Sequence, residues 1–82
     1  MTQGWLKCRI LKGMFSDEST MVYHPPKSRT ASSFFVPKDK VREGDGAVSV
    51  RFFHEGDTVW AVLPAENQPV IPVNKEDVIP NP

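Results

Sequence analysis

The chain has 82 residues, which leaves room for one domain spanning residues 1–82 and little room for a second hydrophobic core. Ten basic and ten acidic side chains give a net charge of zero. This balance argues against a dedicated nucleic-acid-binding protein, because such proteins are usually basic overall. The single cysteine, Cys8, excludes an internal disulfide and a thiolate metal site built within one chain.

The charge is distributed unevenly along the chain. Residues 1–42 carry eight basic and three acidic side chains, whereas residues 43–82 carry two and seven. Such asymmetry is consistent with two halves that attract each other, and also with a basic face that meets a partner. The start of the sequence lacks the pattern of a secretory signal, and no apolar run approaches the roughly 18 residues of a membrane helix. We therefore expect a cytoplasmic protein without a membrane partner.

Alternating apolar and polar residues predict short strands through the first half of the chain. These strands are expected at Trp5–Leu11, Ser19–His24 and Ser33–Val36. Turn-forming residues occupy Lys12–Glu18, and Pro25-Pro26 should end the second strand because proline cannot donate to a strand ladder. The polar, basic segment Lys27–Ser33 is expected to be a mobile loop.

The clearest element is a β-hairpin over residues 48–63, where two alternating apolar runs flank Glu55-Gly56-Asp57. Folding these runs around Glu55-Gly56 pairs Phe53 with Thr58 and Arg51 with Trp60. One face then holds only apolar residues: Val48, Val50, Phe52, Val59, Ala61 and Leu63. The other face is mixed and holds Ser49, Arg51, Phe53, Thr58, Trp60 and Val62. A slip by one residue would mix the two faces, so the hydrophobic pattern should fix the register.

Two further short strands are expected at Val70–Val73 and Val78–Ile79, with a turn at Asn74–Asp77 between them and a frayed tail at residues 80–82. No stretch sustains an apolar period of 3.6 residues, so helix should be minor. The predicted fold class is all-β, a small single-domain barrel of five or six short antiparallel strands. Closure is favoured because an open sheet of this size would leave long unpaired edges.

Two segments of the chain resemble each other. Val36-Pro-Lys-Asp-Lys-Val41 and Val73-Asn-Lys-Glu-Asp-Val78 share terminal valines, a lysine at the third place and an acid at the fourth. In addition, Cys8-Arg9-Ile10 parallels Val50-Arg51-Phe52. One interpretation is an internal duplication, in which each copy consists of two strands followed by a third strand and a turn. The other is that short β-rich sequences have produced these matches by chance.

The ending Val-Ile-Pro-Val-Asn-Lys-Glu-Asp-Val-Ile resembles the close of Src-homology-3-like barrels, in which a strand, a 3₁₀ turn and a short last strand complete the fold. This resemblance covers about the last half of the chain and implies a fold only. The aromatic and acidic loop that binds proline-rich ligands in that class is not evident. The pattern Gly13–Glu18, Phe35-Val36-Pro37 and Val62-Leu63-Pro64 is also similar to small uncharacterised bacterial proteins, and this similarity implies no activity.

Candidate catalytic residues are few. His24 and His54 are the only histidines, and neither has a second ligand at a metal-binding spacing. His54 is expected to face Asp57 across the hairpin turn and to form a hydrogen bond with it. The acids Asp45, Glu55 and Asp57 lie beside glycines, where loop solvation explains them better than acid–base catalysis. We therefore expect no enzyme, no metal site and no cofactor.

The mixed face of the hairpin is the best candidate for a binding site, formed by Arg51, Phe53, Trp60 and Val62. Exposed Trp, Phe and Arg side chains together are typical of a binding hot spot. Arg51 opposite Trp60 would stack its guanidinium on the indole. The alternative is that a loop such as Lys27–Ser33 covers this face.

Three functions remain open from the sequence. The first is a protein-interaction module that binds a protein partner or a second copy of itself through Arg51, Phe53 and Trp60. The second is single-stranded nucleic-acid binding, in which aromatic side chains stack on bases. The phosphates would then be held by Lys7, Arg9, Lys27, Arg29, Lys38 and Lys40. The third is an enzyme with an unrecognised site, and the interaction module ranks first.

Overall fold

The structure is a computed structural model, and it describes residues 1–81. Over these residues the chain forms nine strands and two 3₁₀ turns, where five or six strands were predicted. In chain order they are β1 (Thr2–Lys7), β2 (Arg9–Lys12), β3 (Glu18–Tyr23), β4 (Ser32–Pro37), η1 (Lys38–Lys40), β5 (Val41–Arg42), β6 (Ala47–Glu55), β7 (Thr58–Val62), β8 (Val70–Val73), η2 (Lys75–Asp77) and β9 (Val78–Pro80). None of the described residues forms a helix long and apolar enough to cross a membrane.

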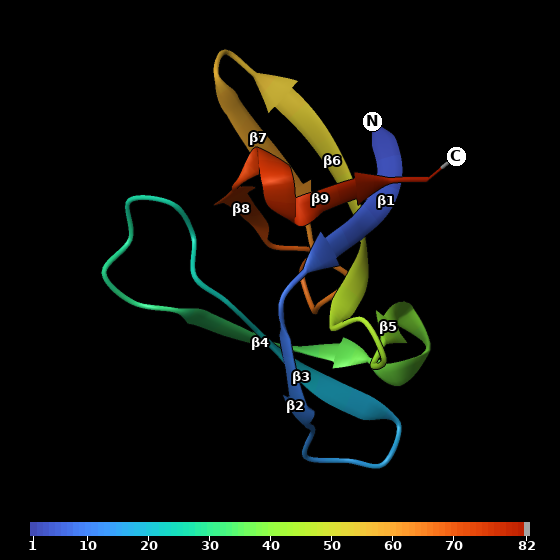
Figure 1. The fold of residues 1–82 in the computed structure, drawn as a ribbon. Coiled ribbons are helices and arrows are strands. Elements are labelled where there is room, and N and C mark those ends of the chain that lie inside the picture. The colour runs from blue at the N-terminus through green and yellow to red at the C-terminus, as the bar shows by residue number, and fades with distance from the viewer. Residues whose placement is uncertain (82) are drawn as a thin grey trace.

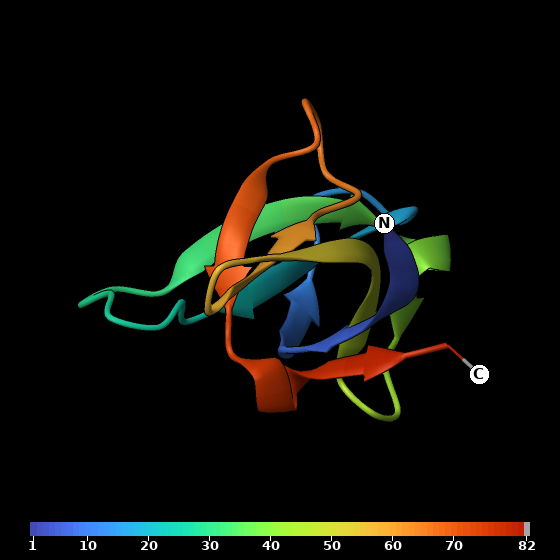
Figure 2. The ribbon, with the colours of Figure 1, turned by 90° about the horizontal axis from the view of Figure 1, so that it is seen from above.

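The strands form two antiparallel sheets, so the all-β prediction is confirmed (Figure 1). The larger sheet has the order β8-β7-β6-β1-β9, with β5 also paired to β6. The smaller sheet has the order β2-β3-β4. Over the described residues β8 and β9 end the path of the larger sheet without pairing to each other. The loop between β3 and β4 projects from the body in both views (Figures 1 and 2).

The predicted strand Trp5–Leu11 is interrupted at Cys8, which is a correction to the sequence interpretation. Residues before Cys8 belong to β1 in the larger sheet, and residues after it belong to β2 in the smaller sheet. The backbone N–H of Cys8 donates to the Gly46 carbonyl at 2.8 Å, which holds the chain at the crossing point. The apolar alternation of Leu6, Cys8 and Ile10 continues through the break, and for this reason the sequence pattern does not reveal it.

The predicted hairpin is present as β6 and β7, but its register differs from the prediction by two residues. Arg51 pairs with Val62 and Phe53 pairs with Trp60, because the turn contains only Gly56 and Asp57. Gly56 has a φ of 60°, which is the conformation of the first central residue in a type II′ hairpin turn. A shift of two residues keeps every side chain on its predicted face. The inward face is apolar as expected, and its residues Val48, Val50, Phe52, Val59, Ala61 and Leu63 are all buried in the core cluster.

The strand pairings of the two halves correspond. The long strand β6 corresponds to β1 and β2 together, and the order β3, β4, η1, β5 is repeated as β7, β8, η2, β9. In the first half Met21 pairs with both Ile10 and Phe34. In the second half Ala61 pairs in the same way with Phe52 and Ile71. This correspondence aligns Cys8-Arg9-Ile10 with Val50-Arg51-Phe52, the parallel that the sequence suggested.

The last strand of each half pairs with the first strand of the other half. β5 joins β6 through Val41 and Val48, and β9 joins β1 through Val78 and Leu6. The two 3₁₀ turns also match, because the N–H of Val41 donates to the Lys38 carbonyl as that of Val78 donates to the Lys75 carbonyl. The two halves are therefore interleaved about the central pair of Leu6 and Val48.

The end of the chain is held against β1 over the described residues. Pro80 lies in β9 and pairs with Gly4, and the N–H of Asn81 donates to the Gln3 carbonyl at 3.1 Å. The predicted frayed tail at residues 80–82 is therefore wrong for residues 80 and 81, while Pro82 lies outside the described residues.

Candidate functional site

The outward face of β6, β7 and β8 brings the four predicted site residues together. Arg51 pairs with Val62 in one row, and Phe53 pairs with Trp60 in the next. Pro72 of β8 extends the second row beyond Trp60, and Val70 extends the first row beyond Val62. Glu55 follows Phe53 on the same face of β6, because side chains alternate along a strand. We call the set Arg51, Phe53, Glu55, Trp60, Val62, Val70 and Pro72 the binding face.

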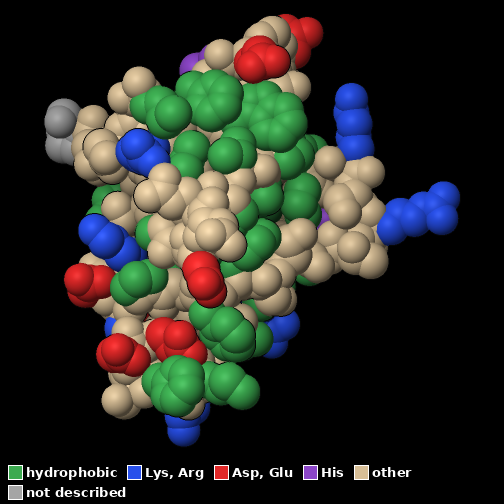
Figure 3. All heavy atoms as spheres, turned by 180° about the vertical axis from the view of Figure 1, so that it is seen from behind, with side chains coloured by type: hydrophobic (Ala, Val, Ile, Leu, Met, Phe, Trp, Pro, Cys, Tyr) green, Lys and Arg blue, Asp and Glu red, His purple; other side chains and the backbone are tan. Residues whose placement is uncertain are grey.

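The binding face reaches solvent unequally. Phe53, Trp60 and Pro72 are half-buried, and Val70 is 48% exposed. Val62 is only 7% exposed, so it supports this face from below instead of offering contact area. Figure 3 shows hydrophobic side chains gathered beneath an acidic tip on this side of the molecule. The face therefore presents a half-buried row of two aromatic rings and a proline on the sheet.

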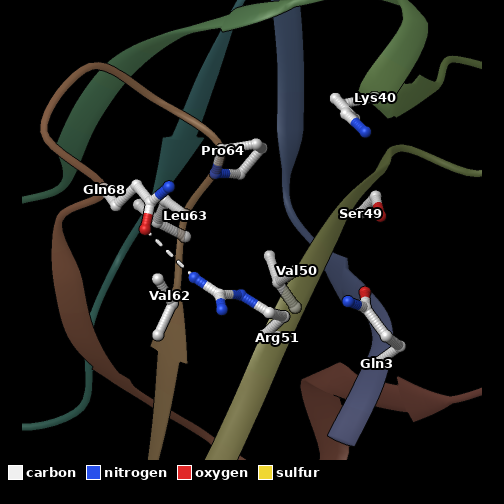
Figure 4. A pocket seen from close by; sticks show the side chains of 9 residues that line it. All are labelled: Gln3, Lys40, Ser49, Val50, Arg51, Val62, Leu63, Pro64 and Gln68. Carbon is white, nitrogen blue, oxygen red and sulfur yellow. Dashed lines mark hydrogen bonds between the residues drawn. The ribbon is translucent and has the colours of Figure 1, made fainter. Parts of the chain in front are cut away.

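A groove with a volume of about 370 Å³ opens beside Arg51 on the same side (Figure 4). Its floor and walls include four apolar side chains: Val50, Val62, Leu63 and Pro64. Its polar lining comes from β1, η1, β6 and the loop after β7: Gln3, Lys40, Ser49, Arg51 and Gln68. Lys40 and Gln68 lie on opposite sides of the groove, and Arg51 extends from β6 toward Gln68 (Figure 4).

Arg51 is held in the groove by a different partner from the one predicted. Its Nη2 donates a hydrogen bond to Gln68 Oε1 at 3.0 Å, and Phe53 occupies the position opposite Trp60. The predicted stacking of Arg51 on Trp60 is therefore wrong, because it depended on the incorrect register. The residue over Arg51 belongs to the loop between β7 and β8, not to the predicted cover Lys27–Ser33.

A cation–π contact does occur on the larger sheet, at Trp5 of β1. The guanidinium carbon of Arg42 lies 4.3 Å from the centroid of the Trp5 ring. Arg42 also forms an ion pair with Asp45 at 2.9 Å. The sequence does not indicate this contact, because Arg42 and Trp5 are brought together by the pairing of both β5 and β1 with β6.

The groove has a counterpart elsewhere in the fold, where hydrogen-bonded side chains fill the corresponding space. There, the Tyr23 hydroxyl donates to Asp77 Oδ2 at 2.7 Å and accepts from the backbone N–H of Asn74 at 2.8 Å. We call these three residues the Tyr23 cluster. By the correspondence of the halves, Leu63 stands where Tyr23 stands, and Lys40 stands where Asp77 stands. Leucine and lysine form no such hydrogen bond, so this space is not bridged.

The pKa values of two groups are shifted by their surroundings. Burial raises the pKa of the Tyr23 hydroxyl to about 12, and the carboxylate of Asp77 adds to this rise, whereas hydrogen bonds from Asn74 oppose it. Burial alone raises the pKa of the Cys8 thiol to about 11. A thiol with such a pKa is almost entirely protonated near neutral pH, which does not suit a nucleophile.

The basic residues proposed to hold phosphates are dispersed. Lys40 lines the groove, while Lys38 lines a second hollow of about 590 Å³ at the β2–β3 turn. Lys27 and Arg29 lie in the loop between β3 and β4. Arg9 lies in β2 of the smaller sheet, and Lys7 ends β1. These six side chains therefore do not form one track along the aromatic row.

The smaller sheet carries exposed apolar residues that the sequence interpretation missed. Leu11 is 42%, Met14 77%, Phe15 68% and Phe35 52% exposed. Leu11 and Phe35 flank Thr20 on the outer face, at the positions that Phe53 and Pro72 take around Trp60 in the other half. Alternation assigns Leu11 and Phe35 to one side of their strands, but only the topology shows that this side is uncovered.

Neither histidine belongs to a metal site among residues 1–81. His24 Nε2 lies 2.6 Å from the Ser28 carbonyl oxygen at the start of the β3–β4 loop. His54 pairs with Val59 in the hairpin, and its ring lies edge-on to the Phe52 ring with 6.4 Å between the two ring centroids. The predicted pairing of His54 with Asp57 is therefore wrong. No group of three His, Cys, Asp or Glu side chains is placed to hold a metal ion within the described part of the chain.

Comparison of the chain with protein-family models, with curated proteins and with solved structures finds no match.

Proposed function

We propose that the protein is a non-catalytic protein-interaction module that binds an extended segment of a partner on the binding face. The observation that carries this proposal is the arrangement of Phe53, Trp60 and Pro72 on three adjacent strands. Partly exposed aromatic rings on a sheet offer apolar contact area and lose little conformational entropy on binding. Arg51 beside this row adds the third residue type that is enriched at hot spots.

The acidic and basic ends of the face support an extended ligand. Along β6 the outward side chains are Glu55, Phe53 and Arg51, in the order acid, aromatic ring and cation. Four residues of a strand span about 13 Å, which an extended peptide of about five residues covers. The complement is a segment with a cation at one end, apolar side chains in the middle and an anion at the other end.

Selection from a phage-displayed library of random 12-residue peptides tests this function. We expect the wild-type protein to enrich peptides that the Trp60→Ala variant binds about 30-fold more weakly, which corresponds to a hot-spot loss of about 2 kcal/mol. Phe15→Ala is the matched control, because it removes an aromatic ring that is 68% exposed outside the binding face. Equal binding by all three proteins, or loss of the fold in Trp60→Ala by circular dichroism, would contradict the proposal.

Self-association is the second form that such an interaction can take. The opposite charges of the two halves would favour contact between the acidic half of one copy and the basic half of another. Sedimentation of the wild type and of Trp60→Ala distinguishes this form, because only a dimer that uses the binding face would dissociate in the variant.

We also propose that the chain is a small Src-homology-3-like barrel and an internal duplication. The placement of β1 between β9 and the β6–β7 hairpin, with a 3₁₀ turn before β9, supports the barrel. The corresponding pairings and 3₁₀ turns of the two halves support the duplication. A crystal structure would test both, because barrel closure requires further pairing between the sheet edges.

A further inference from the structure

The charged side chains that line the groove beside Arg51 are all positive among the described residues. Lys40 and Arg51 contribute two cations, while none of the described residues that line it is acidic. The remaining polar lining consists of two amides and a hydroxyl, from Gln3, Gln68 and Ser49. Amides and hydroxyls can donate hydrogen bonds to an anion, as can ammonium and guanidinium groups.

Arg51 is oriented before any ligand binds. The hydrogen bond from Nη2 to Gln68 Oε1 restricts the side chain, and the pairing of Arg51 with Gln3 and Val62 places it between β1 and β7. The guanidinium has five N–H donors, and the bond to Gln68 uses one of them. An oriented guanidinium loses less conformational entropy on binding than a free one.

The two halves differ in the charges at this groove. In the Tyr23 cluster the carboxylate of Asp77 accepts a hydrogen bond within the protein. At the corresponding place Lys40 puts a cation beside the apolar Leu63, and the space stays open. In the Tyr23 cluster the protein supplies its own carboxylate, Asp77. At the groove it supplies cations instead, which would attract a carboxylate from another molecule.

We propose that Arg51 in this groove binds a carboxylate of the partner peptide, with Lys40 adding positive charge from the other side of the groove, while the apolar part of that peptide lies across Phe53 and Trp60. The inference rests on the proposed function. It adds the chemical group that the groove recognises and the direction in which the peptide lies along β6. The carboxylate end lies at Arg51, and the end near Glu55 carries positive charge. A carboxylate fits because a guanidinium can bind its two oxygens with two parallel N–H donors.

The test uses the peptides that the wild-type protein selects from the display library. Each is synthesised with a free C-terminal carboxylate, with a C-terminal amide, and with its Asp and Glu residues replaced by Asn and Gln. We expect one of the two neutralised forms to bind about tenfold more weakly, since each 1.4 kcal/mol changes affinity tenfold. Loss in the amide form assigns the C-terminus, and loss in the Asn/Gln form assigns a side chain.

Variants locate the carboxylate at the groove. Arg51→Gln and Lys40→Gln should each weaken the charged peptide about five- to tenfold and leave the neutralised peptide unchanged, because the lost interaction is with the carboxylate alone. Lys38→Gln is the control, since it removes the same charge from the same 3₁₀ turn but lines the second hollow. Lys40 is exposed, so Lys40→Gln keeps the test valid if Arg51→Gln fails to fold.

The remaining outcomes contradict the inference in distinguishable ways. Equal affinity for all three peptide forms would overturn the carboxylate site and leave the binding face intact. Failure to select any peptide would overturn the proposed function itself. Displacement of the peptide by oligothymidylate, with affinity that falls steeply with salt, would show that the groove takes nucleic-acid phosphates instead.

Discussion

The hydroxyl of Tyr23 in β3 donates a hydrogen bond of 2.7 Å to Asp77 at the end of η2, although 54 residues separate the two. The same hydroxyl accepts from the backbone N–H of Asn74, which lies between β8 and η2. One phenol oxygen therefore ties the smaller sheet to the C-terminal turn of the other half. This connection is independent of the strand ladders, because β3 pairs only with β2 and β4 in the sheets formed by the described residues.

Tyr23 should ionise at an unusually high pH. Its pKa is raised from 10.0 to about 12, mainly by burial and further by Asp77. Between these values the unfolded chain has lost the proton that the folded protein still holds, so stability falls as pH rises through this window. Tyr23 is the only tyrosine, so tyrosinate absorbance near 295 nm follows it alone. A midpoint near 10 in the folded protein would contradict the buried hydrogen-bonded position.

Removal of the Tyr23 hydroxyl should destabilise the protein. In Tyr23→Phe the backbone N–H of Asn74 loses its partner and Asp77 keeps only the 3.4 Å bond from Asn74 Nδ2. An unsatisfied buried group costs about 1–3 kcal/mol, and a part-buried one costs toward the lower end of this range. Urea unfolding measures this loss, and the fall in stability above pH 10 should be smaller in the variant. Thr20→Val is the control, because it removes an exposed hydroxyl of the same strand that bonds the Lys12 carbonyl. Equal losses in both variants would show that the Tyr23 cluster has no special role.

The sequence pattern predicts which side of each hairpin strand is buried, but not how far the strands slide. The alternation of apolar and polar residues excludes slips by an odd number of residues, because they would exchange the two faces. A slip of two residues leaves both faces unchanged, so the pattern does not exclude it. The choice between the two registers depends on whether the two central turn residues are Glu55 and Gly56, as predicted, or Gly56 and Asp57, as observed. The consequence is chemical, since the observed register places Phe53 opposite Trp60 and frees Arg51 for the groove.

The groove could not be predicted, because its polar residues come from four separated segments. Gln3, Lys40, Arg51 and Gln68 converge only after β1 pairs with β6 and the loop after β7 folds over Arg51. The sequence does identify Arg51 and Val62, which lie on the one element that it resolves clearly. Local patterns thus find residues on a single hairpin, whereas contacts made by interleaved halves require the topology.

Cys8 should react slowly with thiol reagents. Burial raises the pKa of its thiol from 9.0 to about 11, which lowers the thiolate fraction at pH 8 about 100-fold, and the thiolate is the reactive form. We expect the reaction with Ellman's reagent to be at least about 100-fold slower in the native protein than in urea. Cys8 is the only cysteine, so the colour change reports on it directly. Comparable rates in the two conditions would show that the crossing between β1 and β2 opens readily.

Glycine should be the favoured residue at the first position of the hairpin turn. Gly56 has a φ of 60°, and a side chain in this left-handed region costs about 1–2 kcal/mol, even though no atom lies within 4 Å of an added Cβ. Gly44 is the matched control, because an added Cβ there also meets nothing within 4 Å and its φ is not positive. Gly56→Ala should therefore lower the free energy of unfolding in urea by about 1 kcal/mol, while Gly44→Ala leaves it unchanged or raises it slightly by restricting the unfolded chain. Equal effects in the two variants would contradict the two-residue turn and, with it, the register that places Phe53 beside Trp60.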